Sequence, residues 1–153
     1  MIIAFFGHKN ISGIAALSKD VEKAIISNIN LSEPLTFYCG GYGDFDNLCA
    51  NVCRSIKEYI KCEIVFITPY LSENQQRKIN DLINNKSYDC ALYPPIENTP
   101  LKYAISKRNE WIANEADLII AYVAHNYGGA YKSLLYAKRK KKKIINLAEI
   151  NFK

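Results

Sequence analysis

The sequence predicts an α/β protein: a Rossmann-like, three-layer α/β/α sandwich built around a mostly parallel sheet of about six strands. Short apolar runs rich in β-branched and aromatic residues alternate along the chain with longer segments in which apolar residues recur every three or four positions. The apolar runs are continuous rather than alternating, which is typical of parallel strands buried on both faces. This order implies right-handed crossovers, with helices on both faces of one sheet.

The expected elements follow one another regularly. Strands are expected at residues 2–6, 35–38, 64–68, 91–93, 118–123 and 144–147. Helices are expected at residues 13–30, 44–61, 72–84, 101–116 and 129–142. The proline-rich segment 93–100 is expected to be a loop, which either covers a site or merely connects two elements.

The helix at 44–61 has the clearest pattern. Its apolar residues recur on one face of an α-helix, at Phe45, Leu48, Cys49, Val52, Cys53, Ile56 and Ile60. Asp44 stands where an N-cap would satisfy free amide donors. Ser72, followed three residues later by Gln75, predicts a capping box at the start of the next helix.

Length and composition suit a single domain spanning residues 1–153, with 49% hydrophobic and 23% charged residues. The longest apolar runs are far shorter than the ~20 residues that cross a bilayer, and no secretory signal pattern opens the chain. The five cysteines contain no CxxC pair, which argues against a disulfide framework or a zinc finger. We therefore expect a cytoplasmic protein with reduced thiols, no membrane partner, no metal and no cofactor.

The positive net charge of +5 comes from one local run, Lys138 to Lys143, which reads KRKKKK. This run is either a nucleic-acid patch or the solvated last turn of the final helix, where cations interact favourably with the helix dipole. We favour the second interpretation because no aromatic residues interleave with the lysines.

Three expected strands end in unusual junctions. They read Gly7-His8-Lys9, then Gly40-Gly41-Tyr42-Gly43-Asp44, then His125-Asn126-Tyr127-Gly128-Gly129-Ala130. Ligands of open α/β sheets bind beyond the carboxyl ends of the strands, where glycines let a phosphate approach the backbone and a helix N-terminus adds positive charge. Glycines also simply make tight turns, but two glycine-rich junctions in one short chain favour a phosphate or nucleotide site. The dinucleotide and P-loop patterns are both missing, which disfavours nicotinamide redox chemistry and ATP hydrolysis.

Arg108 falls on the apolar stripe of its helix, together with Leu101, Ala104, Ile105 and Ile112. A guanidinium facing a core is costly unless it is paired. Three interpretations stay open: a buried ion pair, for which Glu115 is a candidate; an arginine that extends to water; or an arginine that holds a ligand phosphate.

Other side chains near the junctions offer weaker signals. The two histidines, His8 and His125, can bond phosphate or transfer protons, but no third ligand at a suitable spacing supports a metal site. Tyrosines can stack on a base or bond a ribose, and those beside the glycine loops are Tyr42, Tyr127 and Tyr131.

The order of these motifs resembles the SLOG superfamily. The resemblance rests on Gly7-His8-Lys9, the Gly40–Asp44 junction, Lys107-Arg108-Asn109 with Ala116-Asp117, and Gly128-Gly129-Ala130. That superfamily of Rossmann-like domains includes the LOG phosphoribohydrolases, the DNA-processing protein A family and small YspA-like bacterial proteins, which the chain resembles most. The resemblance spans residues 2–147 and implies a bacterial protein that senses or sequesters a nucleotide-like small molecule, with a homodimer possible.

The resemblance to LOG enzymes is incomplete at the catalytic position. Arg108 matches the arginine of their R-K-x-x-M segment, but their catalytic glutamate falls on Leu134 or Leu135. The resemblance therefore implies a binding cradle without that carboxylate. The alternative is a hydrolase or transferase of N-glycosidic bonds, LOG-like or deoxyribosyltransferase-like, whose catalytic residues would be Asp44, Asp46 and Arg108.

The expected partner is thus a nucleotide-like small molecule, with nucleic acid bound through Lys138–Lys143 as a less favoured alternative. The ligand-binding residues expected on these grounds are Gly7, His8, Lys9, Gly40, Gly41, Tyr42, Gly43, Asp44, Arg108, Asn109, Asn126, Tyr127, Gly128, Gly129 and Ala130.

Overall fold

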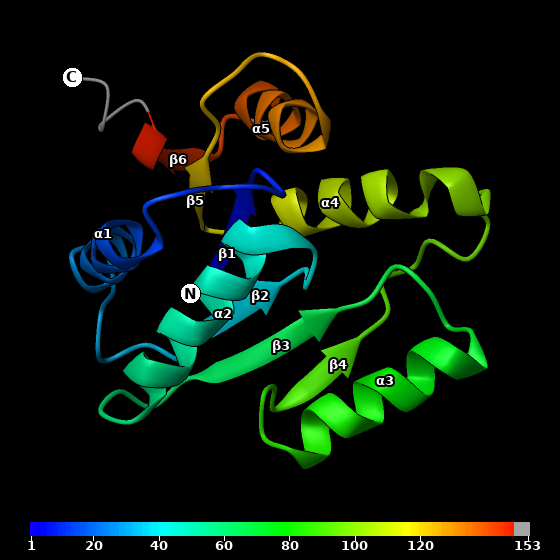
Figure 1. The fold of residues 1–153 in the computed structure, drawn as a ribbon, viewed down its shortest axis with the longest axis horizontal. Coiled ribbons are helices and arrows are strands. Elements are labelled where there is room, and N and C mark those ends of the chain that lie inside the picture. The colour runs from blue at the N-terminus through cyan, green and yellow to red at the C-terminus, as the bar shows by residue number, and fades with distance from the viewer. Residues whose placement is uncertain (149–153) are drawn as a thin grey trace.

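The computed structural model describes residues 1–148 and contains a six-stranded sheet in the order β4-β3-β2-β1-β5-β6 (Figure 1). Every neighbouring pair of strands is parallel. The strands are β1 (Ile2–Gly7), β2 (Thr36–Cys39), β3 (Glu63–Ile67), β4 (Cys90–Leu92), β5 (Leu118–Tyr122) and β6 (Lys143–Asn146). The predicted fold class is confirmed, and the bounds of each strand differ from the predicted ones by at most one residue.

The strand order reverses direction once. The chain builds outward from β1 through β2, β3 and β4, and then returns to the other side of β1 for β5 and β6. The loops that follow β1 and β5 therefore leave the sheet in opposite directions and open a crevice between them. The position of this switch point fixes where a ligand site is expected.

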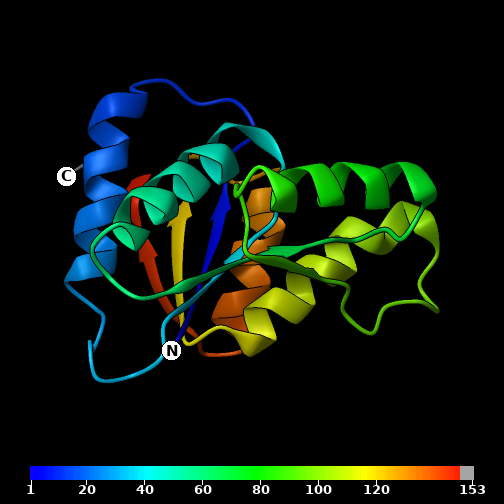
Figure 2. The same ribbon diagram turned by 90° about the horizontal axis from the view of Figure 1, so that it is seen from below.

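Within residues 1–148, the helices α1 to α5 cover the two faces of the sheet (Figures 1 and 2). Apolar side chains of α1 (Ile14–Ile26), α2 (Gly43–Lys57) and α3 (Glu73–Asn84) pack with one face, which includes Phe37 and Ile120. Side chains of α4 (Ala104–Glu115) and α5 (Gly129–Arg139) pack with the other. Successive residues of a strand point to opposite faces, so β1 and β5 are apolar at consecutive positions because each face has its own helical layer.

The predicted apolar stripe of α2 is confirmed, since its members are buried from Phe45 to Ile56 and Ile60 is half-buried. The predicted N-cap is wrong. The cap residue of α2 is Tyr42, and the Asp44 carboxylate lies inside the first turn, where Oδ2 accepts a hydrogen bond from the backbone N of Ile11 (3.1 Å). The helix begins at Gly43, one residue earlier than predicted, so Asp44 is its second residue and not its cap.

The capping box predicted for α3 is half formed. Ser72 Oγ accepts a hydrogen bond from the backbone N of Gln75 (3.3 Å), as predicted. The Gln75 side chain does not return to Ser72, because it donates to Thr68 Oγ1 instead (3.1 Å). This bond ties the start of α3 to the end of β3.

Four of the predicted helices end earlier than expected at their carboxyl ends, α3 ends at residue 84 as predicted, and α4 begins later. The C-cap residues are Ser27 for α1, Glu58 for α2 and Lys140 for α5. Residues Leu101–Tyr103 form a separate 3-10 turn before α4. This turn rotates Leu101 out of the predicted apolar stripe, and 76% of its surface is exposed. Ile105 also lies outside the buried stripe, which consists of Ala104, Arg108, Ile112 and Ala113.

A left-handed residue ends α5 and yields a first prediction. Lys141 has φ 57°, a conformation that costs a non-glycine residue about 1–2 kcal/mol. We expect Lys141→Gly to raise the free energy of unfolding by about 0.5–1 kcal/mol, part of the gain being offset by the entropy of glycine in the unfolded chain. The matched control is Lys138→Gly, which removes the same charge inside the helix and should lower stability by about 1 kcal/mol in urea unfolding. Equal effects of the two changes would contradict the prediction.

The described residues contain no disulfide, no helix that could span a membrane and no metal-binding cluster. All five cysteines are free, and Cys39, Cys49 and Cys53 are buried. None of the helices within residues 1–148 is long and apolar enough to cross a membrane. The same residues contain no group of three or more His, Cys, Asp or Glu side chains that could hold a metal ion.

Candidate functional site

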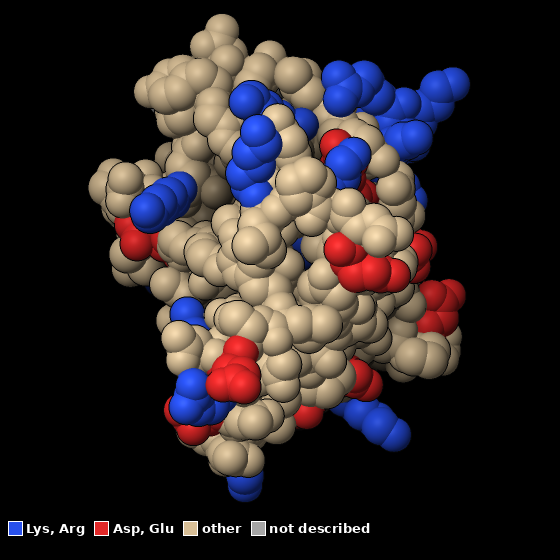
Figure 3. Space-filling view, turned by 90° about the vertical axis from the view of Figure 1, so that its right-hand side faces the viewer, with Lys and Arg blue, Asp and Glu red and all other residues tan. Residues whose placement is uncertain are grey.

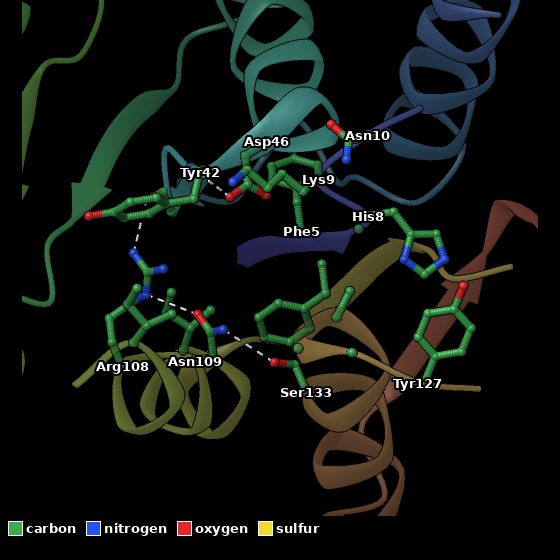
Figure 4. A pocket seen from close by; sticks show the side chains of 18 of the residues that line it. Phe5, His8, Lys9, Asn10, Tyr42, Asp46, Arg108, Asn109, Tyr127 and Ser133 are labelled. Atoms are coloured by element: carbon green, nitrogen blue, oxygen red, sulfur yellow. Dashed lines mark hydrogen bonds between the residues drawn. The ribbon is translucent and has the colours of Figure 1, made fainter. Parts of the chain in front are cut away.

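A pocket of about 620 Å³ lies beyond the carboxyl ends of β1 and β5, at the switch point of the sheet (Figure 4). Its walls come from the end of β1, the loops after β1, β2 and β5, the first turn of α2, and one face each of α4 and α5. The lining residues are Phe5, Phe6, Gly7, His8, Lys9, Asn10, Gly40, Tyr42, Asp46, Ile105, Arg108, Asn109, Ile112, His125, Tyr127, Gly128, Gly129, Ala130 and Ser133.

Most of the residues expected from the sequence lie in this pocket. Those that line it are Gly7, His8, Lys9, Gly40, Tyr42, Arg108, Asn109, Tyr127, Gly128, Gly129 and Ala130. The structure places four others outside the lining, namely Gly41, Gly43, Asp44 and Asn126. The proline-rich loop at 93–100 does not line the pocket either.

The glycine at position 43 has a structural explanation. Gly43 has φ 90°, and a Cβ there would stand 2.7 Å from the Cα of Lys9. The backbone N of Asp44 also donates to the carbonyl of Lys9 (2.8 Å). Glycine is therefore needed at this position so that the loops after β1 and β2 can touch.

Arg108 is buried, with 2% of its surface exposed, and is held by the backbone of two strand ends. Its Nη1 donates to the carbonyls of Gly40 (2.9 Å) and Ile67 (2.7 Å), and its Nε donates to Asn109 Oδ1 (2.9 Å). The ion pair with Glu115 is not formed. Arg108 thus joins the ends of β2 and β3 to α4, and Nη2 is the guanidinium nitrogen for which the described residues provide no acceptor.

Asp46 faces Arg108 across Gly40. A Cβ built on Gly40 would stand 3.2 Å from both Asp46 Oδ2 and Arg108 Nη2. The Asp46 carboxylate is half-buried, and Oδ2 accepts a hydrogen bond from the backbone N of Tyr42 (3.0 Å). Burial raises the pKa of this carboxyl from 3.8 to about 6, and the Tyr42 amide and Arg108 oppose the rise. Asp46 is the one carboxylate among the lining residues that the structure describes.

The Arg108 guanidinium also lies against an aromatic ring. Its central carbon is 5.6 Å from the centroid of the Tyr42 ring, within the range of a cation–π contact. The Tyr42 side chain is 40% exposed, so a face of the ring remains open to the surroundings of the pocket. This contact fixes the tyrosine at the rim.

The opposite rim of the pocket is an aromatic stack of His8, His125 and Tyr127. The centroids of the two imidazoles are 3.7 Å apart, and those of His125 and Tyr127 are 3.9 Å apart. His8 Nε2 accepts a hydrogen bond from the backbone N of Ala124 (2.8 Å), so the neutral ring carries its proton on Nδ1. Burial and the neighbouring His125 lower the pKa of His8. The stack therefore joins the loops after β1 and β5 through a neutral imidazole.

A short polar chain continues from Arg108 along the floor of the pocket. Asn109 accepts from Arg108 Nε and donates from Nδ2 to Ser133 Oγ (3.2 Å), which lies on α5 (Figure 4). The orientation of the Asn109 amide is thereby fixed, and the Ser133 hydroxyl hydrogen is left to donate elsewhere.

The N-terminus of α5 opens into the pocket. Gly128 is its N-cap residue, with φ 91° and ψ 177°, a conformation that is essentially restricted to glycine. A Cβ at Gly129 would meet no atom within 4 Å. Free space therefore lies beside the first residue of α5, at the positive end of a helix dipole.

Sequence reasoning missed several lining residues, namely Phe5, Phe6, Asn10, Ile105, Ile112 and Ser133. Ser133 had a usable signal, because it is a polar residue on the same buried face of α5 as Leu134 and Ala137. Neither Leu134 nor Leu135 lines the pocket, and Leu134 packs with Ala121 and Val123.

The basic run lies away from the pocket. Helix α5 begins at the pocket and extends over eleven residues to Arg139, which is roughly 16 Å of helix. Lys142 Nζ donates to the carbonyls of Asn114 (2.7 Å) and Ala116 (3.2 Å), where it caps α4. Lys143 Nζ donates to Asn28 Oδ1 (3.0 Å). Lys140 Nζ also lies 5.5 Å from the centroid of the Tyr136 ring, so three of the six residues in the run have partners within the described chain.

Basic and acidic side chains are unevenly distributed over the face of the molecule seen in Figure 3. Figure 3, which views the molecule from the right-hand side of Figure 1, shows most of the visible lysines and arginines on the upper half of that face, where α4 and α5 lie. Acidic side chains are more frequent on the lower half. This distribution favours the approach of an anion from the side of α4 and α5.

Comparisons with known proteins identify the fold. No protein-family model and no curated protein sequence matches the chain. Among solved structures, DNA processing protein A from Streptococcus pneumoniae is similar, with a TM-score of 0.63 and 18% identity over 93% of this chain and 48% of that one. DNA processing protein A from Helicobacter pylori, described for its single-stranded DNA binding mode, has a TM-score of 0.62 and 13% identity over 94% of this chain and 63% of that one.

A third structure, the Moco carrier protein of Chlamydomonas rheinhardtii, has a TM-score of 0.54 and 10% identity over 96% of this chain and 75% of that one. The chain spans about half the length of the S. pneumoniae protein and less than two thirds of the H. pylori protein. At these identities the likeness concerns the fold alone. The chain has the Rossmann-like α/β fold that the DNA processing proteins and the Moco carrier protein share, which is the fold expected from the sequence.

Proposed function

We propose that the protein binds a nucleotide or nucleotide-derived small molecule in the pocket between the loops after β1 and β5, as a sensor or sequestering protein of the YspA-like type. The observation that carries the proposal is the location of this pocket at the switch point of the sheet, with the free N-terminus of α5 opening into it. Doubly wound sheets bind their ligands at this point.

The charges around the pocket favour an anionic ligand. The lining includes Lys9, Arg108 and the first amides of α5, against the single carboxylate of Asp46 among the described residues. A phosphate beside Gly129 would find free space, because nothing lies within 4 Å of a Cβ at that position, and backbone amides at a helix N-terminus are donors for such a group.

The aromatic rims suit a planar base. Tyr42 and Tyr127, on opposite sides of the pocket, have 40% and 67% of their surfaces exposed. Tyrosine faces stack on nucleobases, and the pocket volume of about 620 Å³ is typical of small-molecule sites. These features support a mononucleotide-sized ligand.

Nucleic acid remains the less favoured partner. The Helicobacter pylori relative is described as binding single-stranded DNA, but in this chain the basic run begins one helix length from the pocket, and three of its residues have partners within the described chain. A nucleic acid bound through Lys138–Lys143 would lose affinity steeply with salt. A small ligand in the pocket would lose far less.

The N-glycosidic alternative now depends on Asp46, since Asp44 does not line the pocket. Its raised pKa of about 6 suits a proton donor near neutral pH. Analysis of ligand solutions after incubation separates the two functions, because an enzyme of this class releases free base and a binding protein returns the ligand intact.

A charge placed at Gly129 tests the proposal. Gly129→Asp puts a carboxylate at the first position of α5, where it fits sterically and where acidic residues stabilise a helix. We expect the fold to persist and the affinity for nucleoside monophosphates to fall at least tenfold, as like charges repel at short range (about 1.4 kcal/mol for each factor of ten).

The matched control is Gly129→Asn, which has the same shape without the charge and should keep most of the affinity in calorimetric titrations. Equal losses in the two variants would show that the effect is steric. Unchanged affinity in Gly129→Asp would remove the ligand phosphate from the start of α5.

A further inference from the structure

The protein provides the Asp46 carboxylate with fewer hydrogen-bond donors than an ionised carboxylate can accept from. Ionised, it offers about four lone-pair sites on two oxygens. Within residues 1–148, the backbone N of Tyr42 is the one donor bonded to it, at Oδ2. The ion pairs among these residues are Lys57–Asp89 and Lys107–Glu110, so no cation lies within ion-pair distance of Asp46. Oδ1 is therefore left without a protein donor.

This deficit occurs in a half-buried position. Asp46 lies in the first turn of α2, against the buried end of β2, and it lines the pocket. Among the described residues no buried side-chain nitrogen or oxygen lacks a hydrogen-bond partner, so Oδ1 is not sealed off from water but is open to the pocket. Partial burial weakens the hydration of this carboxylate, and the same desolvation raises its pKa. A ligand that brings a donor to Oδ1 would remove the deficit.

The two sides of the pocket differ in charge, because Asp46 lies on one side and the N-terminus of α5 on the other. Figure 4 shows Asp46 and Tyr42 on one side and Ser133 and Tyr127 on the other, beside the start of α5. A phosphate is repelled by Asp46 and attracted to the α5 N-terminus, so the anionic end of a ligand belongs on the α5 side. The part of the ligand that meets Asp46 is then a neutral group with a donor.

We propose that Asp46 is the specificity-determining residue of the site: it accepts a hydrogen bond from a hydroxyl or amine of the ligand and so selects nucleotides that carry that donor. The inference rests on the proposed function. In a nucleotide the donor is either a ribose hydroxyl or an exocyclic amine of the base. Both present the same O–H or N–H to Oδ1, and the two sources are separated by the choice of probes.

The test compares ligands that differ by one donor. The probes are the ribonucleoside 5′-monophosphates, their 2′-deoxy and 3′-deoxy forms, and IMP, in which a carbonyl replaces the amine of AMP. With the wild-type chain we expect loss of the critical donor to weaken binding about ten- to hundredfold, as for a hydrogen bond to a charged group. A loss confined to deoxy forms identifies a ribose hydroxyl, and a loss confined to IMP identifies the amine.

The variant Asp46→Ala should bind the ligand with and without the donor within about threefold of each other, because the acceptor is gone. The control Asp44→Ala removes a carboxylate from the same turn that accepts from the backbone N of Ile11 and does not line the pocket. It should keep the full discrimination, and urea unfolding of both variants checks that each is folded.

The outcomes separate the two proposals. If nucleotides bind and the wild-type chain does not discriminate, or Asp46→Ala discriminates as well as the wild type, the role of Asp46 is overturned and nucleotide binding stands. If none of the probes binds, the proposed function fails, and the inference about Asp46 fails with it.

Discussion

Replacing Arg108 by alanine is expected to lower the free energy of unfolding by about 3–5 kcal/mol, a large share of the stability of a domain of this size. The reason is the pair of carbonyls, Gly40 and Ile67, that both accept from Nη1 and lie where the ends of β2 and β3 are buried. Each loses a charge-assisted hydrogen bond, and the truncated side chain leaves a cavity between α4 and the sheet.

The control is Lys107→Ala on the neighbouring helix position. Lys107 is exposed and forms a surface ion pair with Glu110, so its removal should change stability by less than about 0.5 kcal/mol. Urea unfolding of the two variants gives the comparison. A loss of under 1 kcal/mol in Arg108→Ala would mean that the guanidinium does not hold the strand ends together.

The second large effect is a gain in the stability of the fold. Asp46→Asn is expected to raise the free energy of unfolding by about 1–3 kcal/mol at pH 8. The pKa of Asp46 is near 6 in the folded chain against 3.8 as its ordinary value, so the folded state binds the proton more tightly than the unfolded state. Its contribution to stability is present below pH 4 and is lost as the pH rises through 6. The asparagine removes the buried charge and can still accept from the backbone N of Tyr42.

The advantage of Asp46→Asn should therefore shrink to less than a third of its value when unfolding is measured at pH 4, where the wild-type carboxyl is largely protonated in the folded state. Asp44→Asn, which replaces the carboxylate bonded to Ile11, serves as the control and should show no such gain at pH 8. A variant Asp46→Asn that is less stable than the wild type at pH 8 would contradict the burial argument. A carboxylate that costs stability in the free protein is typical of a binding or catalytic position.

The strands were predictable because the sheet is buried on both faces. Runs such as Leu118–Tyr122 are apolar at nearly every position, and no other element of this fold requires that pattern. The carboxyl ends of the helices were less predictable, because local geometry sets them. Helix α5 ends where Lys141 adopts a left-handed conformation, and a lysine-rich sequence gives no sign of this.

The candidate site was predictable in its location and not in its contacts. The glycine junctions and the position of Arg108 on an apolar stripe indicated the right end of the sheet. The acceptors of Arg108 are backbone carbonyls on two other elements, and every residue has a carbonyl, so the sequence could not single them out. The stack of His8 on His125 likewise joins loops more than a hundred residues apart, which only the strand order brings together.

The most direct test of the account follows the backbone amides of the ¹⁵N-labelled protein during titration with a nucleoside monophosphate that shifts its thermal unfolding. The account predicts that the perturbed amides gather around the pocket, at residues 7–10, at Gly40 and at residues 128–133, while those at residues 138–143 stay in place. Perturbations confined to the lysine run, or scattered without regard to the pocket, would contradict nucleotide binding at the switch point of the sheet.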